Sequence, residues 1–295
     1  MSARLARLEQ RRAYRFVVPA ALLMLAFTLA PVALVALISL TDWQLGADSL
    51  AFVGLANYAE LLQDRVFWKS LRNTFTYVAI YVPASLLLAL PLALAVEASG
   101  RLRGFYRTLF FLPVTTTFVA MAVVWEFLLH PDFGLVNVLL ALVGVPRENW
   151  LAEPGTVLVA LAAIGLWLRL GFYMVLFIAG LRSIPRELYE AAEIDGATGA
   201  WRRFRLVTWP LLGPTTLFVA VIALIQSFQV FETVAVLTRG GPSKSSEVLL
   251  YTMYTEGFSF LRTGYASAIT VVFMLIVFAI TIAKTRFLDA RVHYR

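Results

Sequence analysis

Residues 186–210 read RELYEAAEIDGATGAWRRFRLVTWP, a polar island between two long apolar runs. The stretch predicts a short helix that begins after Ser183 and Pro185, because proline is tolerated in a first helical turn. Acidic residues early in that helix stabilise its N-terminal end through the helix dipole. Gly196 then offers the positive φ that ends many helices, and the neighbouring Asp195 is a turn former. The island is therefore expected to fold locally.

A second short helix is predicted over Ala200–Thr208, with Trp201 and Phe204 on one face. The small residues Ala191 and Ala192 keep the first helix slim. Two interpretations of the island stand side by side. It is either an ordinary cytoplasmic loop held by its positive charge, or a rigid knob that seats in a groove of another protein.

The composition of the whole chain indicates a membrane protein. Of 295 residues, 60% are hydrophobic and only 15% are charged, whereas soluble domains average about 25% charged residues. The formal net charge is +7, but the basic residues lie in short loops between apolar runs, which argues against a nucleic-acid partner. The chain has no cysteine, and only His130 and His293 offer imidazole. Disulfides, thiolate chemistry and a metal site of these ligands are therefore not expected.

Six runs are long and apolar enough to cross a bilayer as helices, which need about 20 apolar residues each. The predicted spans are Phe16–Leu40, Thr74–Val96, Thr108–Leu129, Thr156–Leu181, Leu211–Leu237 and Tyr265–Ala283. The first run is longer than a signal-peptide core and no small-residue cleavage site follows it, so we expect it to stay as a helix. The sequence therefore predicts an all-α, multi-pass protein of the cell (inner) membrane.

The distribution of Lys and Arg predicts the orientation of these spans. Seventeen basic residues lie in the N-terminal segment, in the loops after the second and fourth spans and in the C-terminal tail, whereas six lie in the other loops. Cytoplasmic loops carry the excess of Lys and Arg. Both termini and the island are therefore expected to face the cytoplasm.

The island resembles the EAA loop of ABC importer permeases, whose pattern is E-A-A, three residues, G, nine residues and I-x-L-P. The matching residues are Glu190, Ala191, Ala192, Asp195, Gly196 and Ala197. Ten residues, not nine, separate Gly196 from the Val207–Pro210 segment, and we expect the extra residue in the turn 197–200. In the family, this loop is the coupling helix that docks on a cytoplasmic ATPase. The resemblance therefore implies that these six residues couple the chain to ATP hydrolysis.

Further stretches resemble permeases of carbohydrate importers, and the resemblance covers nearly the whole chain. They are FVGLANYAELL (52–62), FWKSLRNTF (67–75), FLP (111–113), WLRLGF (167–172), AGLRSIP (179–185) and LTRGGP (237–242). The resemblance implies the type I ABC importer transmembrane domain, with six transmembrane helices and a cytoplasmic coupling helix. It implies four partners: a second permease subunit in a heterodimer, two copies of an ATPase, an extracytoplasmic solute-binding protein and membrane lipid.

No G-x-x-x-x-G-K-[ST] phosphate loop occurs in the chain. We therefore expect no cofactor on this chain, with ATP and Mg used by the partner ATPase subunits. No H-E-x-x-H zinc helix and no G-x-S-x-G nucleophile elbow occur either. An intramembrane enzyme is left as a remote alternative to a transport subunit.

Polar residues inside the spans are candidate substrate contacts, because placing a polar side chain at that depth is energetically unfavourable and usually serves a function. Arg169 is the most conspicuous; it either contacts substrate, pairs with Glu126 or Glu232, or reaches the outer surface. Gln226, Gln229 and Thr233 have i, i+3, i+7 spacing and would share one helix face. The resemblance to the maltose-type subunit adds Gly165, Leu168, Phe172 and Ser227. Thr116 is a weaker candidate, because threonines often bond to their own helix backbone.

These observations predict three parts of the chain. They are 1–71, with the first span and an external loop; 72–285, the permease core with the coupling loop 186–210; and 286–295, a cytoplasmic tail. The predicted function is one half of the translocation pathway of a binding-protein-dependent sugar importer. The alternative within transport is an importer of glycerol-3-phosphate or another polyol or phosphodiester.

Overall fold

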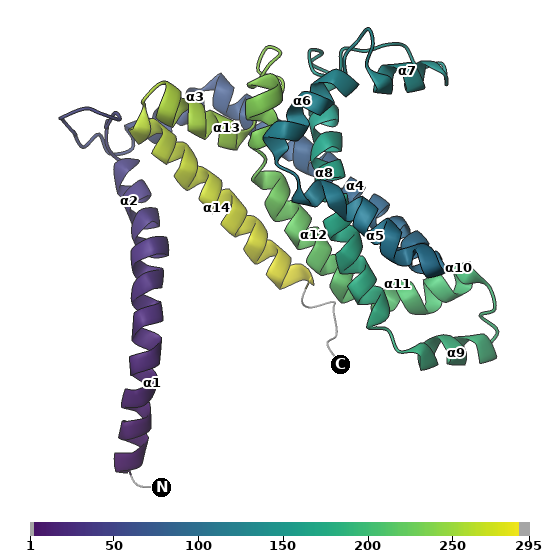
Figure 1. Ribbon diagram of the computed structural model, residues 1–295. Coiled ribbons are helices and arrows are strands. Elements are labelled where there is room, and N and C mark those ends of the chain that lie inside the picture. Colours follow the sequence, from purple (N-terminus) through teal and green to yellow (C-terminus); the bar gives the residue numbers. More distant parts are fainter. Residues whose placement is uncertain (1–2, 289–295) are drawn as a thin grey trace. The chain divides into compact units, whose positions relative to one another are not determined.

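The computed structural model describes residues 3–288, with side chains between 14 and 282, and in this part of the chain every regular element is helical (Figure 1). The only β pairing there is an isolated bridge between Thr41 and Phe52. Most of the predicted tail 286–295, including His293, lies outside the described residues, and the side chains of the arginines before Tyr14 are not described either. The all-helical prediction is confirmed within them.

The chain divides into two compact units, and the division differs from the predicted three parts. One unit joins the N-terminal 64 residues to Met253–Ile282, and the other contains Arg65–Thr252. The final span therefore belongs to the same unit as the first, although more than 200 residues separate them in the sequence.

The first unit contains α1 (Ala3–Met24), a π-helical turn (Leu25–Leu29), α2 (Ala30–Ile38), α3 (Ala56–Gln63) and most of α14 (Thr263–Leu288). The buried Asn57 on α3 donates from its amide to the carbonyl oxygens of Ser39 (2.9 Å) and Thr41 (2.8 Å). Gly264 lies directly against the Thr41 carbonyl. These contacts hold the loop after α2 on α3 and on the start of α14.

The second unit is built around α4 (Arg65–Ala98), α8 (Val157–Arg182) and α12 (Gly213–Phe228), which pack on one another. Around them lie α5 (Arg103–Phe111), α6 (Phe118–Leu128), α7 (Leu135–Ala141), α9 (Arg186–Ile194), α10 (Ala200–Arg203), α11 (Trp209–Leu211) and α13 (Leu249–Tyr254). Six of the twelve largest fully buried side chains of the described residues, among them Tyr173, Phe177 and Leu161, lie on α8. This helix is the centre of the core.

The six predicted spans correspond to four continuous helices and two bent pairs. The continuous ones are Tyr14–Ile38, Arg65–Ala98, Val157–Arg182 and Thr263–Ile282. The prediction of one helix over Thr108–Leu129 is wrong, because the chain bends by 102° between Thr115 and Phe118. Thr116 and Thr117 are extended there, with ψ of 151° and 133°. Pro113 precedes the break, and Thr116 donates back to its carbonyl oxygen at 2.7 Å.

The predicted span Leu211–Leu237 is also interrupted. The helix that ends at Leu211 meets α12 at a bend of 66°, with Pro210 and Pro214 on either side. At its other end α12 stops at Phe228, and after a short irregular segment the chain resumes as a π-helical turn over Val234–Thr238. The continuous core of this span is therefore only the 16 residues of α12.

One carboxylate ties together the ends of α4, α5 and α8 that lie next to the island. Glu97 forms ion pairs with Arg103, Arg107 and Arg182, the last of which is the final residue of α8. Because α9 begins four residues after Arg182, the island starts from a point that is fixed to two other helices.

Candidate functional site

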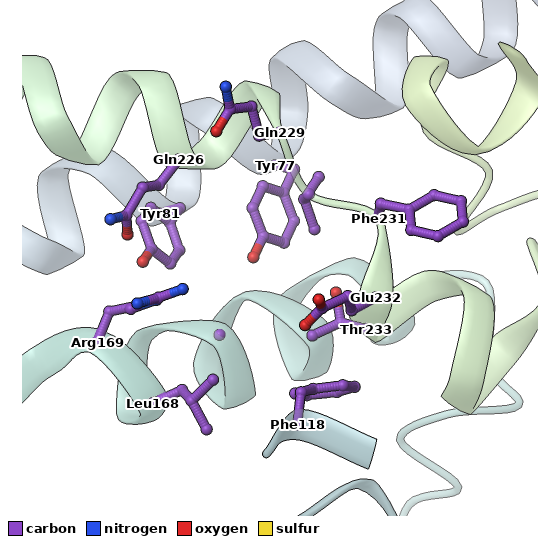
Figure 2. A pocket seen from close by; sticks show the side chains of 12 residues that line it. Tyr77, Tyr81, Phe118, Leu168, Arg169, Gln226, Gln229, Phe231, Glu232 and Thr233 are labelled. Carbon is purple, nitrogen blue, oxygen red and sulfur yellow. The ribbon is translucent and has the colours of Figure 1, made fainter. Parts of the chain in front are cut away.

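A pocket of about 260 Å³ lies where α4 and α8 meet the interrupted end of α12 (Figure 2). Its lining residues are Tyr77, Tyr81, Phe118, Gly165, Leu168, Arg169, Gln226, Gln229, Val230, Phe231, Glu232 and Thr233. Aromatic rings and hydrogen-bonding groups therefore share one cavity, the combination typical of small-molecule sites.

A chain of hydroxyl and amide groups connects the three helices beside this pocket. Tyr77 and Tyr81 lie one turn apart on α4, and their rings stack at 15° with centroids 5.6 Å apart. The hydroxyls of Tyr81 and Tyr173 are 3.1 Å apart, and Tyr173 donates to Oε1 of Gln226 at 2.9 Å. Because such a buried chain is satisfied only at one helix spacing, it fixes α4, α8 and α12 relative to one another.

Two opposite charges line the pocket from different segments. Arg169 projects from α8 toward the tyrosines, whereas Glu232 comes from the segment after α12 (Figure 2). In the described part of the chain no ion pair joins Arg169 to Glu232 or to Glu126, the partners considered from the sequence. Both charged groups are exposed in this single chain, so each keeps hydrogen-bonding capacity for a ligand.

Of the eight predicted pathway residues, five line the pocket: Gly165, Leu168, Arg169, Gln226 and Gln229. Phe172 packs instead against the core. Ser227 is buried and donates to the Leu224 carbonyl oxygen at 2.8 Å, and Thr116 donates to Pro113. Contact of any of the eight with substrate stays a prediction.

The predicted common face of Gln226, Gln229 and Thr233 rested on a continuous helix, and that premise is wrong. The helix ends at Phe228, so the i, i+3, i+7 spacing does not apply beyond it. All three residues nevertheless line the same pocket, where the irregular segment 229–231 separates α12 from the helical turn that begins at Glu232. Interrupted helices that expose polar backbone are characteristic of transporter binding sites.

Sequence reasoning missed Tyr77 and Tyr81 as pocket residues, although the sequence holds a signal for them. Six polar or tyrosine side chains recur at helical spacing along α4 and all are buried: Ser70, Asn73, Thr74, Tyr77, Tyr81 and Ser85. A polar stripe on a membrane helix has to face protein, not lipid. Gly165 on α8 makes room for it, because a Cβ there would lie 2.6 Å from the Tyr77 hydroxyl oxygen.

The island folds as two short helices joined by a glycine turn. Helix α9 ends at Ile194, and Gly196 follows with φ of +88°, as predicted. The Gly196 N–H donates to the Glu193 carbonyl (3.1 Å) and the Ala197 N–H to the Ala192 carbonyl (2.8 Å). This is the Schellman pattern of hydrogen bonds that closes a helix C-terminus. Pro185 is the residue before the helix and not within its first turn.

The six predicted coupling residues divide by exposure. Ala197 is buried and Ala192 half-buried, whereas Glu190, Ala191, Asp195 and Gly196 are exposed. Ile194 at the tip of α9 exposes 88% of its surface. An ion pair of Glu193 with Arg203 and a 3.0 Å contact between the Tyr189 and Thr208 hydroxyls join α9 to the helix that follows. The island is thus a braced projection with an outward-facing apolar tip.

The second island helix changes its winding after four residues. It is α-helical over Ala200–Arg203 and π-helical over Phe204–Thr208, where the expectation was one α-helix. A π turn is closed by an i→i+5 hydrogen bond and therefore holds one residue more than an α turn. The extra residue of the motif therefore has a place inside this helix, and not only in the turn 197–200.

The sequence family described as "Binding-protein-dependent transport system inner membrane component" matches residues 81–294. The chain belongs to this family. It is a transport subunit of the inner membrane, as the sequence predicted, and the pocket and the island are parts of a permease.

Relatives of this permease are similar over most of their lengths. A "Probable ABC transporter permease protein" of Pyrococcus horikoshii is 35% identical over 269 residues, which cover 90% of this chain and 92% of the relative. The sn-glycerol-3-phosphate transport system permease protein UgpA of Agrobacterium fabrum is 37% identical over 244 residues, 82% of this chain and 83% of that one.

The fold of the permease is similar to that of a chain in a crystallised bacterial ABC transporter that imports the acidic polysaccharide alginate. The TM-score is 0.83 at 24% sequence identity, and the match covers 98% of this chain and 100% of that one. The type I importer fold predicted from the sequence is therefore confirmed.

Proposed function

We propose that this permease forms half of the translocation pathway for a neutral carbohydrate. The observation that carries the proposal is the pocket, where stacked tyrosines stand beside the hydrogen-bonding groups of Arg169, Gln226 and Glu232. A sugar ring offers one face of C–H groups and a rim of hydroxyls. Aromatic rings can pack on the C–H face of a sugar, and the charged and amide groups can form hydrogen bonds with its hydroxyls.

The second candidate is a glycerol-3-phosphate importer, which the similarity to UgpA and the available guanidinium of Arg169 both favour. A phosphate would gain from Arg169, but Glu232 lines the same cavity and repels an anion. We therefore favour the neutral ligand.

The test is ATP hydrolysis and uptake by the reconstituted importer with its binding protein. We expect neutral oligosaccharides to stimulate both, and glycerol-3-phosphate to stimulate neither. Stimulation by glycerol-3-phosphate alone would establish the second candidate and refute the first.

The pocket residues give a direct prediction. Arg169→Ala and Gln229→Ala should each lower import by about tenfold or more, because each removes hydrogen bonds that a desolvated ligand needs. Binding of the ATPase should be unchanged, since Arg169 lies more than three helical turns before the end of α8 and Gln229 follows the far end of α12, so neither is part of the island. The measurements are uptake in proteoliposomes and co-purification of the ATPase.

The matched control is Arg72→Ala, which removes an exposed arginine of α4 that does not line the pocket. Import by this variant should stay normal. Normal import by both pocket variants would show that the pathway runs elsewhere.

For energy coupling, we propose that two ATPase subunits, which bind ATP and Mg, dock on the island at the cytoplasmic side, where both termini also lie. A second permease completes the pore, and a binding protein outside the membrane delivers the ligand. The braced helix α9, with its exposed apolar tip, supports this arrangement. ATP closure would move the island and, through Arg182 and Glu97, the ends of α4 and α5.

This arrangement predicts that the purified chain alone turns over no ATP. The assembled importer should hydrolyse ATP, and faster in the presence of loaded binding protein. A phosphate-release assay on both preparations decides the point, and turnover by the single chain would contradict the proposal.

A further inference from the structure

The segment 133–146, between α6 and α8, carries a large apolar surface outside the predicted spans. It reads FGLVNVLLALVGVP and contains no charged residue. Its helix α7 and flanking turns expose large apolar side chains, with 79% of Leu142 and 74% of Val143 accessible. The others are Phe133, Leu135, Val138, Leu139 and Val145. A water-soluble loop does not keep a surface of this kind uncovered.

The only polar side chain of this segment, Asn137, forms its hydrogen bonds within the loop. Asn137 is completely buried, and its amide group donates to the carbonyl oxygens of His130 (3.1 Å) and Glu148 (2.9 Å). Its Oδ1 accepts hydrogen bonds from the backbone N–H of Glu148 (3.3 Å) and from Nε1 of Trp150 (2.8 Å). One amide therefore closes the loop and sets the side on which α7 presents its leucines and valines.

The charges of the loop gather at its base. Asp132 and Arg147 flank the apolar segment, and Nη1 of Arg147 donates to the Asp132 carbonyl oxygen at 3.0 Å. The loop therefore has a polar base and an apolar tip, the division seen in segments that lie in a membrane interface.

The apolar surface continues onto the membrane-spanning helices. Figure 1 shows α7 beyond the ends of α6 and α8, running across the direction of α8. Helix α6 exposes Val119, Val123 and Phe127 along its length. Trp125 lies in the last turn of α6, next to the loop, and Trp150 lies in the loop itself. Tryptophans concentrate at the level of lipid headgroups, so this end of the helices marks the membrane surface.

We propose that the segment 133–146 is a re-entrant interfacial anchor whose leucines and valines lie in the headgroup and upper acyl region of the bilayer. The occupant of this surface is lipid. A soluble binding protein that docks and leaves repeatedly is a poorer fit, because transient interfaces are more polar than this surface. With the orientation proposed above, the leaflet is the outer one.

The chain lacks cysteine, so single labels test the anchor cleanly. Leu139→Cys places a probe on the apolar side of α7, and Asp132→Cys places a matched probe on the exposed polar base of the same loop. Each variant carries a polarity-sensitive fluorophore in the assembled importer, in phosphatidylcholine nanodiscs. Some of these lipids bear a nitroxide near the headgroup, and iodide serves as the aqueous quencher.

We expect nitroxide lipids to quench the label at position 139 about threefold more than the label at 132, and iodide to show the reverse order. Equal iodide quenching at both positions would place α7 in water and overturn the proposal. Protection of position 139 from both quenchers would mean that a protein subunit covers it, and would also overturn the proposal. Nanodiscs expose both membrane faces and the readout needs no transport, so the result does not depend on the proposed orientation or substrate.

Discussion

Gly196→Val should lower ATP-driven import by about tenfold or more while the protein still inserts in the membrane. Gly196 has φ of +88°, and its N–H closes the C-terminus of α9 on the Glu193 carbonyl. A β-branched residue held at positive φ costs about 1–3 kcal/mol. The short turn between α9 and α10 should relax instead, which would move the tip of α9 away from its docking position.

The steric surroundings of Gly196 make this prediction a test of backbone conformation alone. An added Cβ would meet no atom within 4 Å, so the expected loss cannot come from a clash within the chain. Uptake in proteoliposomes and co-purification of the ATPase are the measurements, and we expect both to fall by about tenfold or more.

Two variants control for the loss of a glycine. Gly199→Val changes a glycine in the same turn that is extended, with φ of −92° and ψ of 145°, and that also has open space around it. Valine prefers this conformation, so import should stay near normal. Gly196→Asn should retain more import than Gly196→Val, because asparagine tolerates positive φ. Full import by Gly196→Val would mean that the island is an ordinary solvated loop.

Glu190 tests the docking surface without a change in the turn. The Glu190 side chain is exposed and pairs only with Arg186, at 3.2 Å, within the described residues. An exposed pair of this kind contributes little to stability. Glu190→Lys should therefore leave the fold intact and weaken binding of the ATPase by charge reversal.

Gly171→Ala should destabilise the permease strongly. A Cβ at Gly171 would overlap the Phe110 carbonyl oxygen and would lie 2.6 Å from the Phe110 carbonyl carbon and 2.8 Å from Cα of Phe111. These are backbone atoms of α5, so no side-chain rotation relieves the overlap. Small residues allow such close approach of membrane helices, and here α5 would have to move off α8.

The cost of this overpacking should be about 3 kcal/mol, which lowers the midpoint of thermal unfolding by roughly 6–12 °C. Thermal unfolding of the detergent-solubilised protein measures it. Gly104→Ala is the matched control, because Gly104 lies on the same α5 and has no atom within 4 Å of an added Cβ. The control should unfold at the wild-type temperature or above it. Equal midpoints for both variants would show that α5 and α8 are not in backbone contact at Gly171.

The sequence was most informative where structure depends on neighbouring residues. The end of α9 at Gly196 was predicted because a positive φ and a Schellman closure involve only residues 192–197. The apolar runs located the four continuous spans and the two bent pairs, because lipid requires a helix of fixed minimum length. The resemblance carried by the island and by other short stretches identified the family for the same reason, since each motif is contiguous in the sequence.

Other features depended on residues that the sequence does not place together. The break at Thr116 and Thr117 and the early end of α12 at Phe228 interrupt apolar runs that are long enough to cross a bilayer as one helix. Near these breaks the hydroxyl of Thr116 donates to the Pro113 carbonyl oxygen and that of Ser227 to the Leu224 carbonyl oxygen. Hydrophobic periodicity does not reveal such bonds. The role of Gly171 likewise depends on α5, which lies some 60 positions earlier in the chain.

The sequence by itself determined that this chain is a helical inner-membrane permease with a locally folded island, because apolar length, short motifs and turn chemistry act over a few residues. Only the tertiary structure decided which polar residues share a cavity. Tyr77 and Tyr81 come from α4, Arg169 from α8, and Gln226 and Glu232 from either side of a helix break. Their meeting depends on how three distant helices pack, and that packing is fixed by hydrogen bonds such as Tyr81 to Tyr173 that link residues 92 positions apart.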